Sequence, residues 1–418
     1  MEYETCTSAI IREDRIHYYK CLPEDHPKSI ETLDPNQEAL ENLFRGKVAF
    51  GITASNQNNT MSSRVKNCIK NASMLETLRQ MAGAVVEKGM CFMGAEHYIL
   101  EPGFMVFLPQ EADTSAMSQI SSTAKDHKQT YFFRYVASDK NVMQELIHTE
   151  SQKVVSTSIV KSIPAPEVHP AFFTRENNAL FHTVEEALKV LSQMGTKESE
   201  EVLRIAEGSA TKESSQGEMR HPFIVVEGLD GTGKTTLTRN LRTKMGAVSL
   251  RSPPDILRPL RAHFDSQPDL IRRAYYAVGN YIAAQQIFQA CQESPVVMDR
   301  FWHSTAAYTI ATETEGGDVS SLPPPGHWAY QWPRDMVKPH VVLFLNVRED
   351  IRDQRLRGRR EAITTEEINL RGSKLFRERL VEAYRRMQEP SVQEIDTSGS
   401  PKKVTQTALE IITTAVKI

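Results

Sequence analysis

The stretch Phe223-Ile-Val-Val-Glu-Gly-Leu-Asp-Gly-Thr-Gly-Lys-Thr-Thr236 joins an apolar run to a glycine-rich loop. Its octet from Gly228 to Thr235 fits the pattern G-x-x-x-x-G-K-[ST]. Glycines in such a loop let backbone N–H groups approach phosphate oxygens, the lysine adds a positive charge, and the hydroxyl reaches Mg²⁺. The residues that follow are typical of a helix whose positive N-terminal end faces the anion. The stretch therefore predicts a site for a nucleoside triphosphate.

The predicted ATP-binding residues are consecutive in the chain. They are Gly228, Leu229, Asp230, Gly231, Thr232, Gly233, Lys234, Thr235 and Thr236. We expect Lys234 to contact the outer phosphates and Thr235 to bind the metal. The alternative is an ordinary glycine turn between a strand and a helix.

The composition is that of a globular protein with more than one core. The chain has 418 residues, of which 40% are hydrophobic and 25% charged, with a formal net charge of −3. This near-neutral balance gives no broad basic surface, so we expect no nucleic acid polymer as partner. The five cysteines have no metal-ligand spacing, and no apolar run reaches the roughly 18 residues of a membrane span. The first residues carry acids early and resemble neither a signal nor a transit peptide, which favours a cytosolic protein.

A polar stretch over residues 207–220 has little to bury and predicts a linker. It separates an N-terminal domain, residues 1–206, from a second domain, residues 221–418. For the first domain we expect an α+β fold of unknown function. Its predicted elements are helices over 73–88 and from the Thr183-x-x-Glu186 capping box to about Gly195, and strands over 97–100, 104–108 and 131–136.

Three apolar runs, at 223–227, 296–298 and 341–345, are separated by long helical stretches in the second domain. This alternation predicts an α/β fold with a parallel sheet flanked by helices. Ligands of such sheets bind at the carboxyl ends of the strands. Asp299 and Arg300 end the second run, and we expect Asp299 to bind Mg²⁺ and Arg300 to grip the phosphate of an acceptor. The alternative is a surface ion pair.

Five arginines lie within nine residues after the third run, at positions 352, 355, 357, 359 and 360. Phosphoryl transfer depends on neutralising the charge of the moving group, which arginines of a closing segment can do. We therefore predict that Arg355, Arg357 and Arg359 belong to a lid. A solvated helix face is the alternative.

The order and spacing of these segments resemble the thymidylate kinase family. The resembling segments are 223–236, Asp299-Arg-Phe with Ser304 and Ala307-Tyr308, 338–347, the arginine-rich lid and 395–401. The resemblance covers residues 221–418 and implies a P-loop nucleoside monophosphate kinase domain that uses ATP with Mg²⁺. It is greatest to a mitochondrial branch of the family that acts on UMP and CMP, which implies a mitochondrial location, with the cytosol as the alternative. Family members are dimers, so the resemblance also implies a possible homodimer.

The resemblance places an acceptor pocket at six positions: Arg251, Tyr276, Asn280, Arg300, Ser304 and Tyr308. Asn280 stands where family members carry an arginine that bonds a thymine carbonyl. Because an amide both donates and accepts, Asn280 could address uracil or cytosine. The alternative is that Tyr276 is a core aromatic and Asn280 an ordinary polar residue of the helix.

These observations predict an ATP-dependent kinase that converts UMP, CMP, dUMP and dCMP to the diphosphates. The predicted catalytic residues are Lys234, Asp230, Arg300, Arg355, Arg357 and Arg359. Two alternatives stay open: a thymidylate kinase that prefers dTMP, and a regulatory or antiviral protein that only binds nucleotide.

Overall fold

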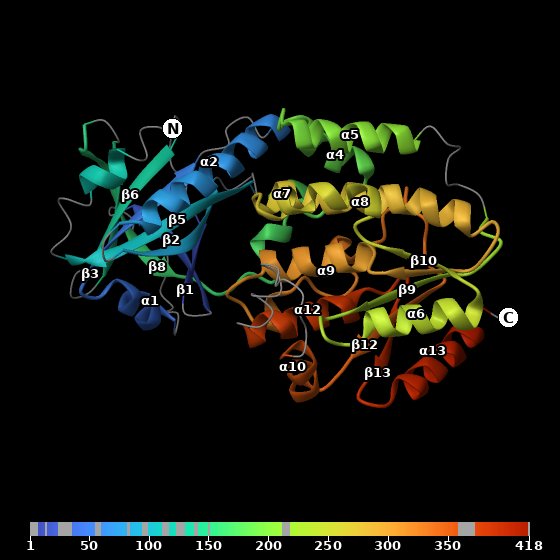
Figure 1. Ribbon diagram of the computed structural model, residues 1–418. Coiled ribbons are helices and arrows are strands. Elements are labelled where there is room, and N and C mark those ends of the chain that lie inside the picture. The colour runs from blue at the N-terminus through green and yellow to red at the C-terminus, as the bar shows by residue number, and fades with distance from the viewer. Residues whose placement is uncertain are drawn as a thin grey trace. The chain divides into compact units, whose positions relative to one another are not determined.

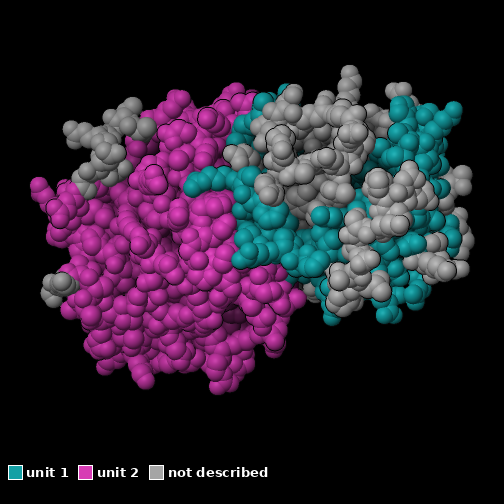
Figure 2. Space-filling model, turned by 180° about the vertical axis from the view of Figure 1, so that it is seen from behind, with its two compact units in different colours: residues 1–178, 314–317 teal, residues 179–313, 318–418 magenta. Residues whose placement is uncertain are grey.

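The computed structural model describes residues 7–12, 15–23, 36–54, 60–81, 84–93, 99–110, 117–122, 130–137, 141–148, 151–210, 218–357 and 373–416. The chain divides into two units (Figure 2). The first comprises residues 1–178 with 314–317, and the second comprises residues 179–313 with 318–418.

The first unit is built on a closed barrel of antiparallel strands in the order β1-β2-β8-β7-β6-β3-β5-β4. The strands are β1 (Thr7–Arg12), β2 (Arg15–Pro23), β3 (Lys47–Ala54), β4 (Val85–Met93), β5 (Ile99–Pro109), β6 (Thr130–Ala137), β7 (Val142–Ile147) and β8 (Val154–Ser162). The helices include α1 (Gln37–Phe44), α2 (Met61–Arg79) and the short η3 (Pro170–Phe172) and η4 (Arg175–Asn177), and residues 117–122 are helical as well.

Alternate residues of the barrel strands pack into two apolar layers. On one side Phe44 of α1 stacks on Tyr135 with ring centroids 5.4 Å apart. On the other side Met74 and Leu78 of α2 pack in a cluster that includes Phe50. The predicted mixture of helices and strands is present here, but the strands dominate.

The helix predicted over 73–88 is wrong at both ends. α2 begins at Met61 and ends at Arg79, and residues 85–88 belong to β4. Val85 and Val86 pair with Phe107 and Val106 of β5. This long-range pairing overrides the helical spacing of the local sequence, as tertiary context commonly does.

The second unit holds a parallel sheet in the order β10-β11-β9-β12-β13, as predicted from the three apolar runs (Figure 1). The strands are β9 (Phe223–Gly228), β10 (Val248–Arg251), β11 (Val296–Asp299), β12 (Val341–Asn346) and β13 (Val392–Asp396). The helices are α4 (Val184–Ser192), α5 (Lys197–Ala210), α6 (Lys234–Met245), α7 (Arg261–Asp265), α8 (Asp269–Ala290), α9 (Trp302–Glu313), α10 (Glu349–Arg357), α12 (Lys374–Arg386) and α13 (Pro401–Val416), with the short η5 (Asp255–Leu260), η6 (Val319–Ser321) and η7 (Trp328–Tyr330).

Helices cover both faces of this sheet. Ile224 and Val226 of β9 point into a core formed with α6 and α13. Phe223 and Glu227, at the alternate positions of the strand, point to the opposite face. There the ring centroid of Phe223 lies 5.5 Å from that of Phe301, which immediately precedes α9. The carboxyl ends of β9 and β11 thus meet at one edge, where the predicted site residues lie.

The boundary between the units differs from the predicted one. α4 and α5 contact α8 and belong to the second unit, which begins at Ala179. α5 also extends to Ala210, so residues 207–210 are helical, and residues 211–217 lie outside the described part. The predicted start of α4 is confirmed, because Glu186 N donates to Thr183 Oγ1 at 3.3 Å. None of the described helices is both long and apolar enough to cross a membrane.

Candidate active site

The predicted phosphate loop connects β9 to α6. At Gly228 φ is 138°, and a Cβ there would lie 2.5 Å from the Leu345 carbonyl oxygen, so only glycine fits. Gly233, with φ of 98°, caps α6. Thr232 closes the turn by donating from Oγ1 to the Leu229 carbonyl at 2.8 Å. The loop therefore leaves the N-terminal N–H groups of α6 at the edge of the sheet, where they can bind an anion.

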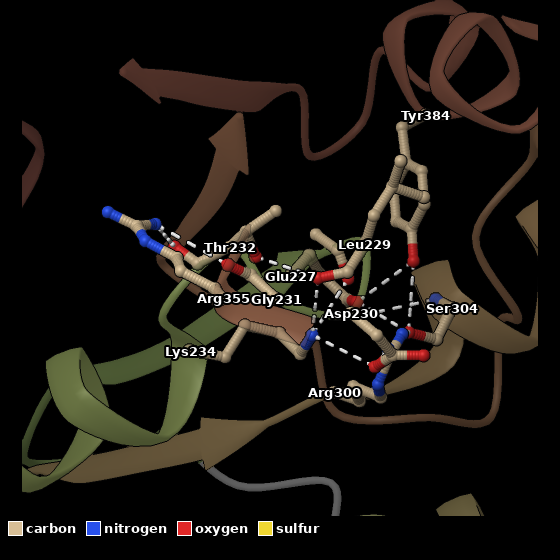
Figure 3. Close-up of polar contacts among 11 residues, drawn as sticks. Glu227, Leu229, Asp230, Gly231, Thr232, Lys234, Arg300, Ser304, Arg355 and Tyr384 are labelled. Carbon is tan, nitrogen blue, oxygen red and sulfur yellow. Dashed lines mark hydrogen bonds and ion pairs between the residues drawn. The ribbon is translucent and has the colours of Figure 1, made fainter. Parts of the chain in front are cut away.

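Lys234 is folded into this loop (Figure 3). Its Nζ donates to the carbonyl oxygens of Gly228 at 3.0 Å and Leu229 at 2.8 Å, and lies 3.6 Å from the Asp230 carboxylate. Burial, together with the positive charge of Arg300, lowers the pKa of Lys234 to about 8. This buried ammonium lies where the loop would enclose phosphate oxygens.

Arg300 pairs with the phosphate loop. Its Nη2 donates to Asp230 at 2.7 Å and its Nη1 donates to Ser304 Oγ at 3.2 Å. Its guanidinium carbon lies 5.7 Å from the ring centroid of Tyr308. About 20% of the side chain is exposed, so an incoming phosphate can reach it. The partner in this ion pair comes from the loop after β9 and is not the neighbouring Asp299.

Glu227 is a polar residue that the sequence analysis did not select. It is fully buried, and its carboxylate accepts four hydrogen bonds, two from backbone N–H groups and two from hydroxyls. The hydroxyls belong to Ser304 and Tyr384. A carboxylate inside an otherwise apolar strand, immediately before the first loop glycine, was the signal that could have identified it.

The two predicted metal ligands lie on one cavity. Thr235 and Asp299, together with the acceptor candidate Arg251, line a cavity of about 810 Å³. A hydroxyl and a carboxylate are oxygen donors that suit Mg²⁺, which takes its other ligands from water and phosphate. Among the described residues there is no group of three or more His, Cys, Asp and Glu side chains that could hold a metal ion.

The guanidinium of Arg355, in the predicted lid, contacts backbone carbonyls of the phosphate loop and of Thr397. Nη2 donates to the Thr397 carbonyl at 2.8 Å, and Nη1 lies 3.4 Å from the Gly231 carbonyl oxygen. Arg355 also lines a cavity of about 290 Å³ beside the start of α6. Arg357 is exposed at the end of α10, and Arg359 lies outside the described residues.

Gly231 packs against α10. A Cβ at this position would lie 3.1 Å from Cγ of both Arg352 and Leu356, and φ is 85°. The loop therefore has room for the α10 residues only because this position carries no side chain.

Of the acceptor candidates, two contact Arg300, and the other three have partners elsewhere. Ser304 and Tyr308 surround Arg300, as described above. Asn280 is fully buried: its Nδ2 donates to Thr305 and its Oδ1 accepts from Ser252. Its amide thus joins α8 to α9 and to the end of β10, and recognition of a base by Asn280 stays a prediction.

The remaining two candidates are occupied by acidic partners. The Tyr276 hydroxyl donates to Asp265 at 2.7 Å, and the half-exposed Arg251 pairs with Asp255 at 2.7 Å. Tyr276 is partly buried and Arg251 is exposed.

Comparison with known proteins agrees with the resemblance stated from sequence. Residues 226–408 match the thymidylate kinase family model. The chain is 40% identical over 260 residues to human "UMP-CMP kinase 2, mitochondrial", which covers 62% of this chain and 57% of the human protein. A thymidylate kinase from Leptospira interrogans (serovar Lai) is 26% identical over 212 residues, 47% of this chain and 95% of that protein. A solved thymidylate kinase from Candida albicans aligns with a TM-score of 0.38 at 20% identity, over 47% of this chain and 93% of that one.

Proposed function

We propose that this chain, whose residues 226–408 match the thymidylate kinase family model, is an ATP-dependent pyrimidine nucleoside monophosphate kinase. Its acceptors would be UMP, CMP and their deoxy forms, and its products ADP and the diphosphates. The human relative's name supports this choice of acceptors, although the chain spans only 57% of that relative's length. The observation that carries the proposal is the placement of two cations, Lys234 and Arg300, on either side of Asp230.

The donor would bind through the loop. Lys234 would exchange the carbonyls of Gly228 and Leu229 for the outer phosphate oxygens of ATP. The cavity of about 290 Å³ next to the loop, lined by Leu237, Pro401 and Val404 among others, offers apolar side chains to the base. Mg²⁺, held by Thr235 and Asp299 together with the phosphates, would neutralise charge on the donor.

The acceptor would bind through Arg300. Its planar guanidinium would exchange Asp230 for the monophosphate, which it can grip with two parallel hydrogen bonds. An oxygen of that phosphate then attacks the γ-phosphorus, and the bond from γ-phosphorus to the bridging oxygen breaks, which leaves ADP. Lys234, with Arg355, Arg357 and Arg359 of the lid, would offset the charge that builds on the transferred group.

The decisive experiment measures ADP formation by the full chain with UMP, CMP, dUMP, dCMP and dTMP as acceptors. We expect turnover with all of the uracil and cytosine nucleotides at rates above that with dTMP. Thymidylate kinase is the second candidate, because the matched family model bears that name. A preference for dTMP would select it, and ATP binding without transfer to any acceptor would select a regulatory nucleotide-binding protein.

Two further expectations concern the whole protein. The human relative's name includes "mitochondrial", so we propose the mitochondrion as the location of this chain, with the cytosol as the alternative. Imaging of the tagged full chain against a mitochondrial marker tests this. We also propose a homodimer, which sedimentation of the purified chain would detect.

A further inference from the structure

Glu227 links the donor strand to the element that begins beside Arg300. Its Oε1 accepts from the backbone N–H groups of Phe301 at 2.9 Å and Ser304 at 3.2 Å. Phe301 immediately precedes α9 and Ser304 lies in its first turn, where backbone N–H groups have no partner within the helix. The Glu227 carboxylate therefore caps α9 from β9, and its negative charge interacts favourably with the positive end of the helix dipole.

Arg300 needs such support because its backbone is strained. Its φ is 64°, in the left-handed region that residues other than glycine rarely adopt. Its own N–H donates to the Val226 carbonyl at 3.1 Å, and the next residue is held by Glu227. Arg300 and Phe301 are thus both hydrogen-bonded to residues of β9, which keeps the guanidinium directed at Asp230.

A hydroxyl connects the carboxylate to the guanidinium (Figure 3). Ser304 Oγ donates to Glu227 Oε2 at 2.5 Å and accepts from Arg300 Nη1 at 3.2 Å. The fork of Arg300 is therefore held on both branches, one by Asp230 and the other by Ser304.

The same carboxylate oxygen also accepts a hydrogen bond from a hydroxyl of α12, the helix that follows the lid segment. Tyr384 of α12 donates to Glu227 Oε2 at 3.1 Å and lies 3.0 Å from Ser304 Oγ. Its ring is fully buried and packs on Phe344 with centroids 4.7 Å apart. A shift of α12 would therefore move the Tyr384 hydroxyl, alter the hydrogen bonds of Ser304 and so change the position of the Arg300 guanidinium.

Charged groups of both signs lie close together around Arg300. Two carboxylates, Glu227 and Asp230, face two cations, Lys234 and Arg300, all largely buried. Burial raises the pKa of Glu227, whereas Arg300 and the hydrogen bonds from Ser304, Phe301 and Tyr384 oppose this rise. The guanidinium is thus compensated before any phosphate arrives.

We propose that Glu227 is a positioning residue for the acceptor phosphate. Glu227 orients Arg300 through Ser304, and its hydrogen bond with Tyr384 makes this orientation depend on the position of α12. This inference rests on the proposed kinase function. Glu227 does not touch the reacting atoms in this assignment. Its effect is on how well Arg300 is oriented, and so on the acceptor far more than on ATP.

The variant Tyr384→Phe tests the link at its far end, because it removes one hydroxyl and keeps the ring that packs on Phe344. The matched control is Tyr330→Phe, which removes a buried hydroxyl that binds the Pro323 carbonyl at 2.9 Å and also interacts with Arg386 of α12, but which leaves the hydrogen bonds of Glu227 in place. We expect Tyr384→Phe to raise the KM for CMP about tenfold, with the KM for ATP changed less than twofold, since one hydrogen bond to a buried carboxylate is lost. Tyr330→Phe should leave both KM values unchanged.

A second variant guards against a purely structural effect. Ser304→Ala removes the bridge itself and should raise the KM for CMP at least as much, whereas Ser304→Thr keeps a hydroxyl and should restore it in part. If wild-type protein turns over no monophosphate, the proposed function fails and this inference with it. If wild-type turnover is normal but Tyr384→Phe changes neither KM, or changes both equally, the positioning role alone is overturned.

Discussion

The donor half and the acceptor half of the candidate site are built in different ways. The donor half is a single run, Gly228 to Thr236, in which backbone groups and one lysine make the contacts. The acceptor half gathers side chains from β9, from the loop after it, from the start of α9 and from α12 around Arg300. A backbone site tolerates few changes of glycine or lysine, whereas a side-chain network can be weakened one bond at a time. Changes to the donor half should therefore abolish activity, and changes to the acceptor half should raise KM.

The largest effect is expected from Lys234→Ala. Loss of the only ammonium inside the loop should lower turnover by about 1000-fold, as loss of a charge aimed at the transition state does. The measurement is kcat for ADP formation at saturating CMP. Lys244→Ala, on the exposed last turn of the same helix, is the control and should keep wild-type turnover. Equal behaviour of the two variants would remove Lys234 from the mechanism.

A rise in pH should weaken binding of ATP to the donor half without weakening binding of CMP to the acceptor half. Burial lowers the pKa of Lys234 to about 8, so the side chain is charged below that pH and loses its charge above it. Phosphates bind the charged form, so the dissociation constant for ATP should rise about tenfold between pH 7 and pH 9. Calorimetry of ATP and of CMP binding over this range makes the comparison.

Binding of CMP should change little over the same range, because a guanidinium stays charged there. An ATP affinity that is flat between pH 7 and pH 9 would contradict the assignment of the buried ammonium to the phosphates.

A smaller effect is expected from Gly231→Ala. The new Cβ would meet Arg352 and Leu356 of α10 at 3.1 Å in a backbone that disfavours side chains, which should lower the free energy of unfolding by about 2 kcal/mol. Gly246→Ala shares the positive φ but has nothing within 4 Å, so its cost should be about 1 kcal/mol. Chemical denaturation of both variants checks this. A difference of zero would mean that α10 does not pack on the loop as described.

The same contrast explains what could be predicted from the sequence. The donor half is contiguous, so spacing alone identified Lys234 and the strand and helix around it. The parallel sheet followed from apolar runs separated by helices. Asp299 and Arg300 were predicted as site residues because the carboxyl end of a strand is a general site for ligands.

What could not be predicted depends on residues far apart in the chain. The role of Glu227 appears only when Ser304 and Tyr384, 77 and 157 residues away, meet its carboxylate. Asn280 was predicted to address a base or to be an ordinary polar residue of its helix, and its hydrogen bonds to Ser252 and Thr305, 28 and 25 residues away, could not be predicted from the helix alone. Residues 85–88 looked helical until β5 paired with them, and α4 and α5 join the second unit because α8 lies beside them.

The central claim is that Arg300 holds the acceptor and Lys234 the donor, and Arg300→Lys tests it most directly. Lysine keeps the charge but loses the planar fork, so the KM for CMP should rise about 30-fold while the KM for ATP stays within twofold of wild type. Steady-state kinetics with each substrate varied in turn gives both values. An equal rise in both KM values, or no rise in that for CMP, would contradict the division of the site into these two halves.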